Sequence, residues 1–191
     1  MTKDIPVLDS YRINLDTYLV APYKEGEKIY SYIFDKNGEY IVKRKPFYII
    51  RKSCDLFGYN YNAAIRFSKN FFGKDKHKVP INLPHLEAPN IMIPIYSPSS
   101  PNNIWIGLHG ISIISDPKLP TEITLPDGKE HPLPVSFTSF QTQYLRAIEL
   151  YKHVFNLKQE IKPENKPKPK PLKPINPIYP LNQDQDLDQD D

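Results

Sequence analysis

Basic, aromatic and amide side chains are interleaved over one stretch of the chain, residues 36–78. The stretch holds eleven basic against three acidic residues, a net charge of +8, whereas the whole chain of 191 residues carries +3. Lys and Arg that neutralise phosphates release condensed counterions, which supplies affinity for a polyanion without sequence information. Reading bases also needs Arg or Asn at a groove edge, or an apolar wedge that kinks the duplex. The pattern favours a surface that binds nucleic acid.

The candidate DNA-binding residues form two groups, one near residues 43–52 and one on a predicted helix that follows. They are Lys43, Arg44, Lys45, Arg51, Lys52, Arg66, Lys69 and Asn70. The last three could share the solvent face of the helix, with apolar residues on its other face. The alternative interpretation is that the first group consists of solubilising charges at strand ends and that the aromatic residues belong to the core.

Catalytic and metal-binding patterns are not found. Cys54 is the sole cysteine, which excludes an intramolecular disulfide, and no known reactive-cysteine signature surrounds it. The five histidines have no metal-ligand spacing, and there is no glycine-rich phosphate loop. We therefore predict no catalytic residue, no metal and no cofactor, and expect that the protein is not an enzyme. A Cys54 nucleophile with His77 as its base is the enzymatic alternative.

Aromatic and β-branched runs predict the strands that would position these side chains. A hairpin is predicted from residues 28–34 to residues 40–42, because the intervening Asn37-Gly38 accepts positive φ at both central turn positions. Trp105 is expected to face the core. Further strands are predicted at 18–23, 47–51, 91–96 and 104–115, the last bending at Gly107 or Gly110, and a second hairpin joins 123–125 to 133–135 through Asp127-Gly128.

Two helices are predicted. The shorter covers residues 61–72, with Asn60 or Asn62 as its N-cap and Gly73 as its stop. The longer begins near Ser139, where flanking residues have the spacing of a capping box, and its apolar residues then recur at three- and four-residue intervals. That apolar stripe should pack on the sheet.

The chain is predicted to divide at about residue 160. Residues 1–160 would form one strand-rich α+β domain of antiparallel hairpins with two helices. Residues 161–191 hold seven prolines, interleaved lysines and an acidic end, so we predict a disordered tail that cannot bury enough apolar surface to offset its ordering entropy. Its alternating Lys and Pro residues at 166–174 favour polyproline II. Without a membrane-length apolar run or a secretory signal, the protein is expected to be soluble and cytoplasmic, with no membrane partner.

Several short motifs follow one another in a fixed order over roughly residues 10–155. They are Lys45-Pro46, Arg51-Lys52-Ser53-Cys54-Asp55-Leu56-Phe57-Gly58, Tyr61 with Ala63, His77-Lys78-Val79-Pro80-Ile81, the Ser97–Pro101 turn, Trp105-Ile106 with His109, Thr121-Glu122-Ile123-Thr124, Gly128-Lys129, Leu133-Pro134-Val135-Ser136, and Ser139-Phe140 with Gln143 and Arg146. In this order and spacing the motifs resemble those of the bacterial competence transcription factor family ComK. The Ser-Cys-x-x-Phe-Gly element and the stretch from Gly128-Lys129 to Ser139-Phe140 are the most specific.

The resemblance implies an activator that binds paired A·T-rich boxes of double-stranded DNA through the minor groove and switches on genes for DNA uptake. It also implies homo-oligomers, because members of the family are understood to bind as dimers that assemble further on the promoter. The minor groove narrows at A-tracts, which attracts inserted Arg or Lys. The stretch of +8 coincides with the Ser53–Ala63 part of the resemblance.

The C-terminal tail departs from the family pattern. Members of the family carry a charged, partly helical extension linked to proteolysis through an adaptor, whereas this chain has Pro-Lys repeats and an Asp-Gln end. A proteolysis adaptor is thus a partner implied by the family and put in doubt by this tail. The acidic end could compete with DNA for the basic surface. The alternative function, from another class, is a protein-interaction adaptor whose Pro-rich tail docks on an aromatic groove.

Overall fold

The computed structural model describes residues 4–55 and 58–161, and over these residues the fold is α+β, as predicted. The strands are β1 (Val7–Leu8), β2 (Thr17–Glu25), β3 (Lys28–Asp35), β4 (Gly38–Val42), β5 (Ile81–Leu83), β6 (Asn90–Pro94), β7 (Trp105–Gly107), β8 (Ile113–Ile114), β9 (Glu122–Thr124) and β10 (Glu130–Pro132). The helices are α1 (Pro46–Cys54), α2 (Tyr61–Phe72) and α3 (Phe137–Ile161), with a short 3-10 turn, η1 (Leu108–Gly110). The predicted tail lies outside the described residues from position 162 onward.

Two sheets are formed by these strands. The larger has the order β1-β4-β3-β2-β7-β6-β5, and the smaller has the order β10-β9-β8. All pairings are antiparallel except that of β1 with β4. Both predicted hairpins are present, β3–β4 and β9–β10, but with shifted details. The two-residue turn of β3–β4 is Lys36-Asn37 and not Asn37-Gly38, because Asp35 pairs with Gly38. The second strand of the other hairpin is Glu130–Pro132 and not residues 133–135. At the first turn, the Asn37 amide donates to the Asp35 carboxylate at 2.8 Å, and Gly38 has a φ of 147°.

The predicted single strand over residues 104–115 is wrong in its continuity. The chain instead forms β7, turns through η1 and passes into the second sheet as β8. The break falls where the sequence predicts a bend, and the cause is close packing on β2. A Cβ at Gly107 would lie 2.5 Å from the Thr17 carbonyl oxygen, and one at Gly110 would lie 2.6 Å from the Tyr18 Cα.

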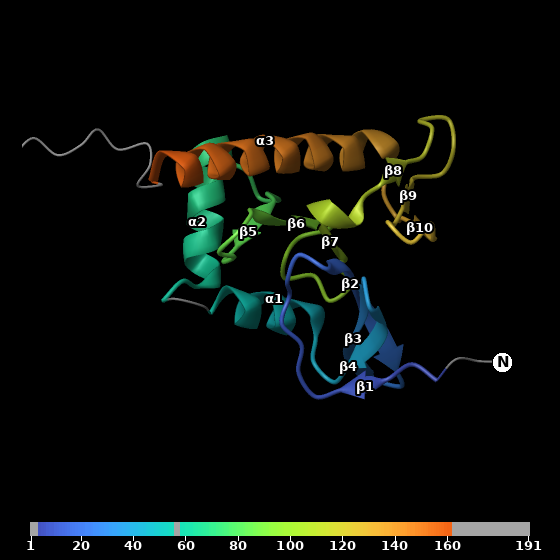
Figure 1. Cartoon of the computed structure of the whole chain (residues 1–191). Coiled ribbons are helices and arrows are strands. Elements are labelled where there is room, and N and C mark those ends of the chain that lie inside the picture. Colours follow the sequence, from blue (N-terminus) through green and yellow to red (C-terminus); the bar gives the residue numbers. More distant parts are fainter. Residues whose placement is uncertain (1–3, 56–57, 162–191) are drawn as a thin grey trace, which may run out of the picture.

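The larger sheet is covered on both faces (Figure 1). Trp105, fully buried as expected, belongs to the cluster that α1 and α2 cover, together with Val20 and Ile33. The neighbouring Ile106 belongs to a second cluster with Phe140 of α3 and residues of the smaller sheet. A third cluster lies between β6 and the C-terminal half of α3. Successive side chains of a strand point to opposite faces of the sheet, so Trp105 faces α1 and α2, whereas Ile106 faces α3 and the smaller sheet.

α1 is a correction to the prediction, which placed a strand at residues 47–51 and only two helices in the domain. Pro46 occupies the first turn of α1, where its fixed φ suits a helix and its missing N–H is not needed. Ile49, Ile50, Ser53 and Cys54 are buried, and this helical period of burial overrides the strand preference of the β-branched isoleucines. The local preference for a strand is therefore overridden, because as a helix the segment buries one complete face against the sheet.

The other two helices agree with the prediction. α2 spans the predicted residues, its N-cap is Asn60, whose side chain accepts from the Ala63 amide at 2.9 Å, and Gly73 follows it with a φ of 115°. α3 begins at Phe137, two residues before the predicted start. The predicted capping box is therefore wrong, because its residues lie inside the helix and the Ser136 hydroxyl accepts from the Ser139 amide at 3.3 Å. Among the described residues, no helix is both long and apolar enough to cross a bilayer.

Candidate nucleic-acid interface

Lys43, Arg44 and Lys45 are exposed in the turn that leads from β4 into α1. The turn is anchored because the Ser31 hydroxyl donates to the Arg44 carbonyl at 2.7 Å. The Arg44 guanidinium lies over the Tyr48 ring, 5.4 Å from its centroid. This cation–π contact holds the Arg side chain along the surface without neutralising its charge. The turn therefore presents three cations beside a half-exposed aromatic ring.

The exposed face of α1 continues this basic surface. Tyr48, Arg51 and Lys52 follow one another at helical spacing on the side opposite Ile49 and Ile50. Lys52 Nζ lies 3.4 Å from an Asp55 carboxylate oxygen, and both side chains are about half exposed. An exposed pair of this kind contributes little to stability, so Lys52 can exchange its partner for a phosphate at small cost.

β3 supplies the facing wall of this surface. Lys28 and Tyr30 line an open hollow together with Lys43, Arg44 and Tyr48. The prediction missed Lys28 and Tyr30 because they lie in the hairpin arm, outside the basic stretch. Their contribution follows from the hairpin register, in which Ser31 of β3 pairs with Val42 of β4. The hollow is thus open and partly aromatic, and its four cations outnumber its one acid, Glu27.

α2 carries the second group of candidate residues. Arg66 and Asn70 are exposed, Lys69 is half-buried, and all three line one shallow hollow. Asn62 and Lys74, which the prediction did not assign to binding, line the same hollow. Asn62, Arg66 and Asn70 are four residues apart, so they form one stripe along the helix. Phe71 is one of the apolar residues of this helix, yet it is 41% exposed, and its ring stacks on that of His153 of α3 with centroids 4.4 Å apart.

An aromatic contact joins the two helices. The ring of Phe47 on α1 meets Tyr61, the first residue of α2, edge to face at 5.0 Å. Tyr61 also lines the hollow of α2, and Arg51 lies one helical turn beyond Phe47. In Figure 1, α1 and α2 meet at the side of the molecule away from the three-stranded sheet. We call the exposed surface of residues 43–52 and of the α2 stripe 62–70 the basic face.

Comparison with known proteins identifies the family. The family model described as "ComK protein" matches residues 8–160. The chain belongs to the ComK family. It is similar to the competence transcription factor of Bacillus subtilis (strain 168), with 32% identity over 145 residues, which cover 75% of this chain and 74% of the relative. No solved structure matches the chain. ComK is a family of transcription factors and not of enzymes.

Four of the eleven cations in residues 36–78 lie outside the basic face of this ComK-family chain, and of these only Lys74 lines one of its hollows. Lys36 lines a separate pocket, and Lys76 pairs with Asp75 at 2.8 Å. Lys78 is half-buried, its Nζ donates to the Ile95 carbonyl at 3.0 Å, and burial lowers its pKa. The net charge of the stretch therefore overstates the charge of any one surface.

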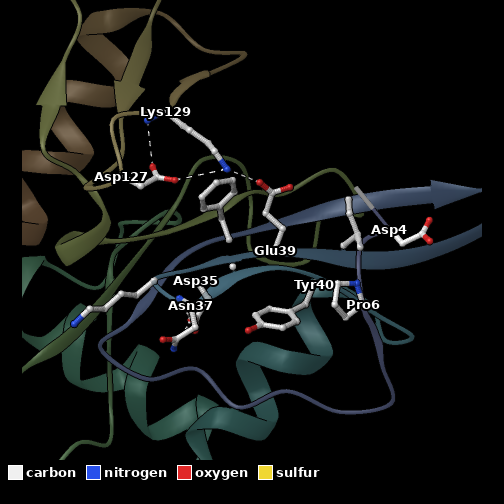
Figure 2. A pocket seen from close by; sticks show the side chains of 12 residues that line it. Asp4, Pro6, Asp35, Asn37, Glu39, Tyr40, Asp127 and Lys129 are labelled. Carbon is white, nitrogen blue, oxygen red and sulfur yellow. Dashed lines mark hydrogen bonds and ion pairs between the residues drawn. The ribbon is translucent and has the colours of Figure 1, made fainter. Parts of the chain in front are cut away.

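The pocket that contains Lys36 has the opposite character (Figure 2). Asp35, Glu39 and Asp127 line it, and the one further cation on its lining, Lys129, is paired with Glu39 at 2.5 Å and with Asp127 at 3.6 Å. The Lys129–Glu39 pair joins the turn of β9–β10 to the β3–β4 hairpin, whereas the Lys129–Asp127 pair lies within that turn, as Figure 2 shows. A surface whose acids outnumber its cations disfavours a phosphate backbone. The pocket is thus a structural junction and no part of the basic face.

Cys54 is enclosed beneath the basic face. It is completely buried in the cluster that α1 and α2 cover, and burial raises the pKa of its thiol to about 12. The thiolate needed for nucleophilic chemistry is therefore strongly disfavoured at neutral pH. No group of three or more His, Cys, Asp or Glu side chains that could hold a metal occurs in the part of the chain that the structure describes.

Proposed function

We propose that this protein is a DNA-binding transcriptional activator of competence genes. The observation that carries the proposal is the basic face, which consists of two hollows in which cations outnumber acids, one beside the start of α1 and one along α2. The two helices that carry these hollows are in contact through Phe47 and Tyr61. Membership of the ComK family supports the role in competence, since the Bacillus subtilis relative is named as a competence transcription factor.

The chemistry of the basic face suggests a division of work between its residues. Lys43, Lys45, Lys52 and Lys69 are flexible cations suited to phosphate contacts, which set affinity. Arg44, Arg51 and Arg66 are more weakly hydrated, so they lose less on entering a narrow groove. Asn70 is a short amide that can reach a base edge. We propose that A·T-rich boxes are recognised through the minor groove by these side chains.

Inosine substitution separates the two grooves. An I·C pair lacks the guanine N2 amino group, so its minor groove resembles that of A·T while its major groove resembles that of G·C. Three duplexes of equal length, with A·T, I·C or G·C in the paired boxes, are compared by gel shift at two salt concentrations. The proposal predicts comparable binding to A·T and I·C and weaker binding to G·C. Loss of binding on I·C would assign recognition to the major groove.

We also propose that several copies of the protein bind one promoter, because each of the paired boxes has to be bound by its own copy or copies. Sedimentation of the protein on duplexes with one box or with two tests this stoichiometry. The duplex with two boxes should carry about twice as many copies as the duplex with one box. A single copy on the two-box duplex would contradict the proposal.

A further inference from the structure

An apolar groove lies where the C-terminal end of α3 meets α2 and the loop after β5. Val154, Leu157 and Ile161 form one stripe of α3 along it, at helical spacing, and Phe67 of α2 and Leu86 of the loop line the other sides. The groove encloses about 390 Å³. Leu86 is 80% exposed and Ile161 is 70% exposed. Adjoining exposed aliphatic side chains beside an apolar hollow are typical of a docking surface.

The walls of the groove are fixed before anything occupies it. Lys158 Nζ donates to the carbonyls of His85 and Leu86, at 2.5 Å and 3.4 Å, which ties the loop to α3. Phe67 stacks on His153 of α3 with ring centroids 5.7 Å apart, which ties α2 to α3. A groove held on both sides is pre-organised, so an occupant does not have to order it.

The sequence after α3 contains a segment that suits such a groove. Residues 171–181, which lie outside the described residues, repeat a three-residue pattern in which a proline is followed by an aliphatic residue and then by a residue of another kind. The prolines are 171, 174, 177 and 180, the aliphatic residues are Leu172, Ile175, Ile178 and Leu181, and the third residues are Lys173, Asn176 and Tyr179. Polyproline II has three residues per turn, so in that conformation the four aliphatic side chains would form one ridge, spaced by about 9 Å.

We propose that residues 171–181 dock in the apolar groove of their own chain through this aliphatic ridge. The chain leaves α3 at Ile161, which itself lines the groove, and ten residues separate it from Leu172. Those ten residues can span up to about 33 Å, so the ridge can return to the groove without strain. A tether of this length gives an effective concentration on the order of millimolar, which favours this segment over a free partner. Tyr59 and Phe67 supply the aromatic walls that proline-rich segments prefer.

Disulfide trapping in the full-length chain tests the docking directly. Buried Cys54 does not interfere, and Ile175→Cys is combined either with Leu86→Cys at the groove or with Leu119→Cys, an exposed residue of the β8–β9 loop. In Figure 1 that loop lies at the opposite end of α3. The proposal predicts a disulfide within one chain that forms at least tenfold faster with Leu86→Cys. Equal rates would overturn it. A disulfide mainly between chains, with a rate that rises with protein concentration, would also overturn it and assign the groove to a second copy.

A matched pair of tail variants provides the second readout. One variant replaces the four aliphatic residues of the ridge by Ser, and the control replaces Lys173, Asn176 and Tyr179 by Ser. The methyl signals of Leu86, Leu157 and Ile161 are followed by NMR in each full-length protein. Only the ridge variant should shift them. Signals that stay unchanged in both variants, or that shift equally in both, would overturn the proposal and leave the groove to another protein.

Discussion

Removing four cations from the basic face should reduce the salt dependence of DNA binding by a calculable amount. Arg51, Lys52 and Arg66 are exposed and Lys69 is half-buried on α1 and α2, so each can bring its charge to the duplex, the lysines at phosphates and the arginines in the groove between them. If each cation neutralises one phosphate, it contributes about 0.9 to the slope of log affinity against log salt, so the upper limit for four cations is about 3.6. Over a fourfold change in salt, from about 50 mM to 200 mM, that slope corresponds to an affinity change of about 150-fold. We therefore expect the variant in which all four residues are replaced by Ala to have a slope that is lower in magnitude by up to about 3.6.

The control has to carry the same change in net charge. Lys24, Lys36, Lys118 and Lys152 are exposed cations outside the basic face, and replacing them by Ala removes four charges in the same way. Fluorescence anisotropy on one A·T-rich duplex at several salt concentrations gives the slope for each protein. The control should retain the original slope. The reasoning is refuted if both quadruple variants lower the slope equally, because net charge and not the basic face would then set the affinity.

Four further predictions concern the fold and the tail. Burial raises the pKa of the Cys54 thiol to about 12, so at pH 8 Cys54 should react with iodoacetamide only as fast as the protein unfolds, and faster labelling of the native protein would contradict its burial. The stability that the neutral thiol contributes should be complete below about pH 9 and lost as the pH rises towards 12. In urea titrations, Asn60→Ala should lower the free energy of unfolding by about 1 kcal/mol, because it removes the N-cap of α2. Asn62→Ala, at an exposed position, should change the free energy of unfolding by less than about 0.5 kcal/mol, and similar losses in both variants would argue against the cap. Gly110→Ala should cost about 1–3 kcal/mol, because its Cβ would lie 2.6 Å from the Tyr18 Cα, and an unchanged melting temperature would show that the close approach is not strict. Deleting residues 162–191, which carry six acidic residues, should tighten DNA binding at low salt if the acidic end competes for the basic face, and unchanged affinity would exclude that competition.

Most of the fold could be predicted because its local signals agree with its packing. The two predicted hairpins form at the Asn-Gly and Asp-Gly signals, although the first turn lies one residue earlier than predicted, and α2 has an Asn cap before it and a glycine after it. α1 could not be predicted in this way. Ile49 and Ile50 favour a strand when taken alone, and only their packing against the sheet, with Ser53 and Cys54 one turn later, shows that the segment is a helix.

The candidate site could be predicted in composition but not in shape. Arg66, Lys69 and Asn70 share a hollow, as the helical spacing indicates. The positions of Lys36 and Lys78 could not be predicted, because a charge count along the chain does not show which cations the fold turns towards acids or into the core. One local signal for the position of Arg44 was present in the sequence. Tyr48 follows Arg44 by four residues, and in the structure the guanidinium lies over its ring.

The central claim is that DNA contacts α1 and α2 on the basic face. Backbone amide NMR signals of the full-length protein, recorded with and without an A·T-rich duplex, test this claim most directly. We expect the largest shifts at residues 43–52 and 62–70, with small shifts in β8, β9 and β10. If the largest shifts fall in the three-stranded sheet or around the acidic pocket of Figure 2, the basic face is not the DNA-binding surface.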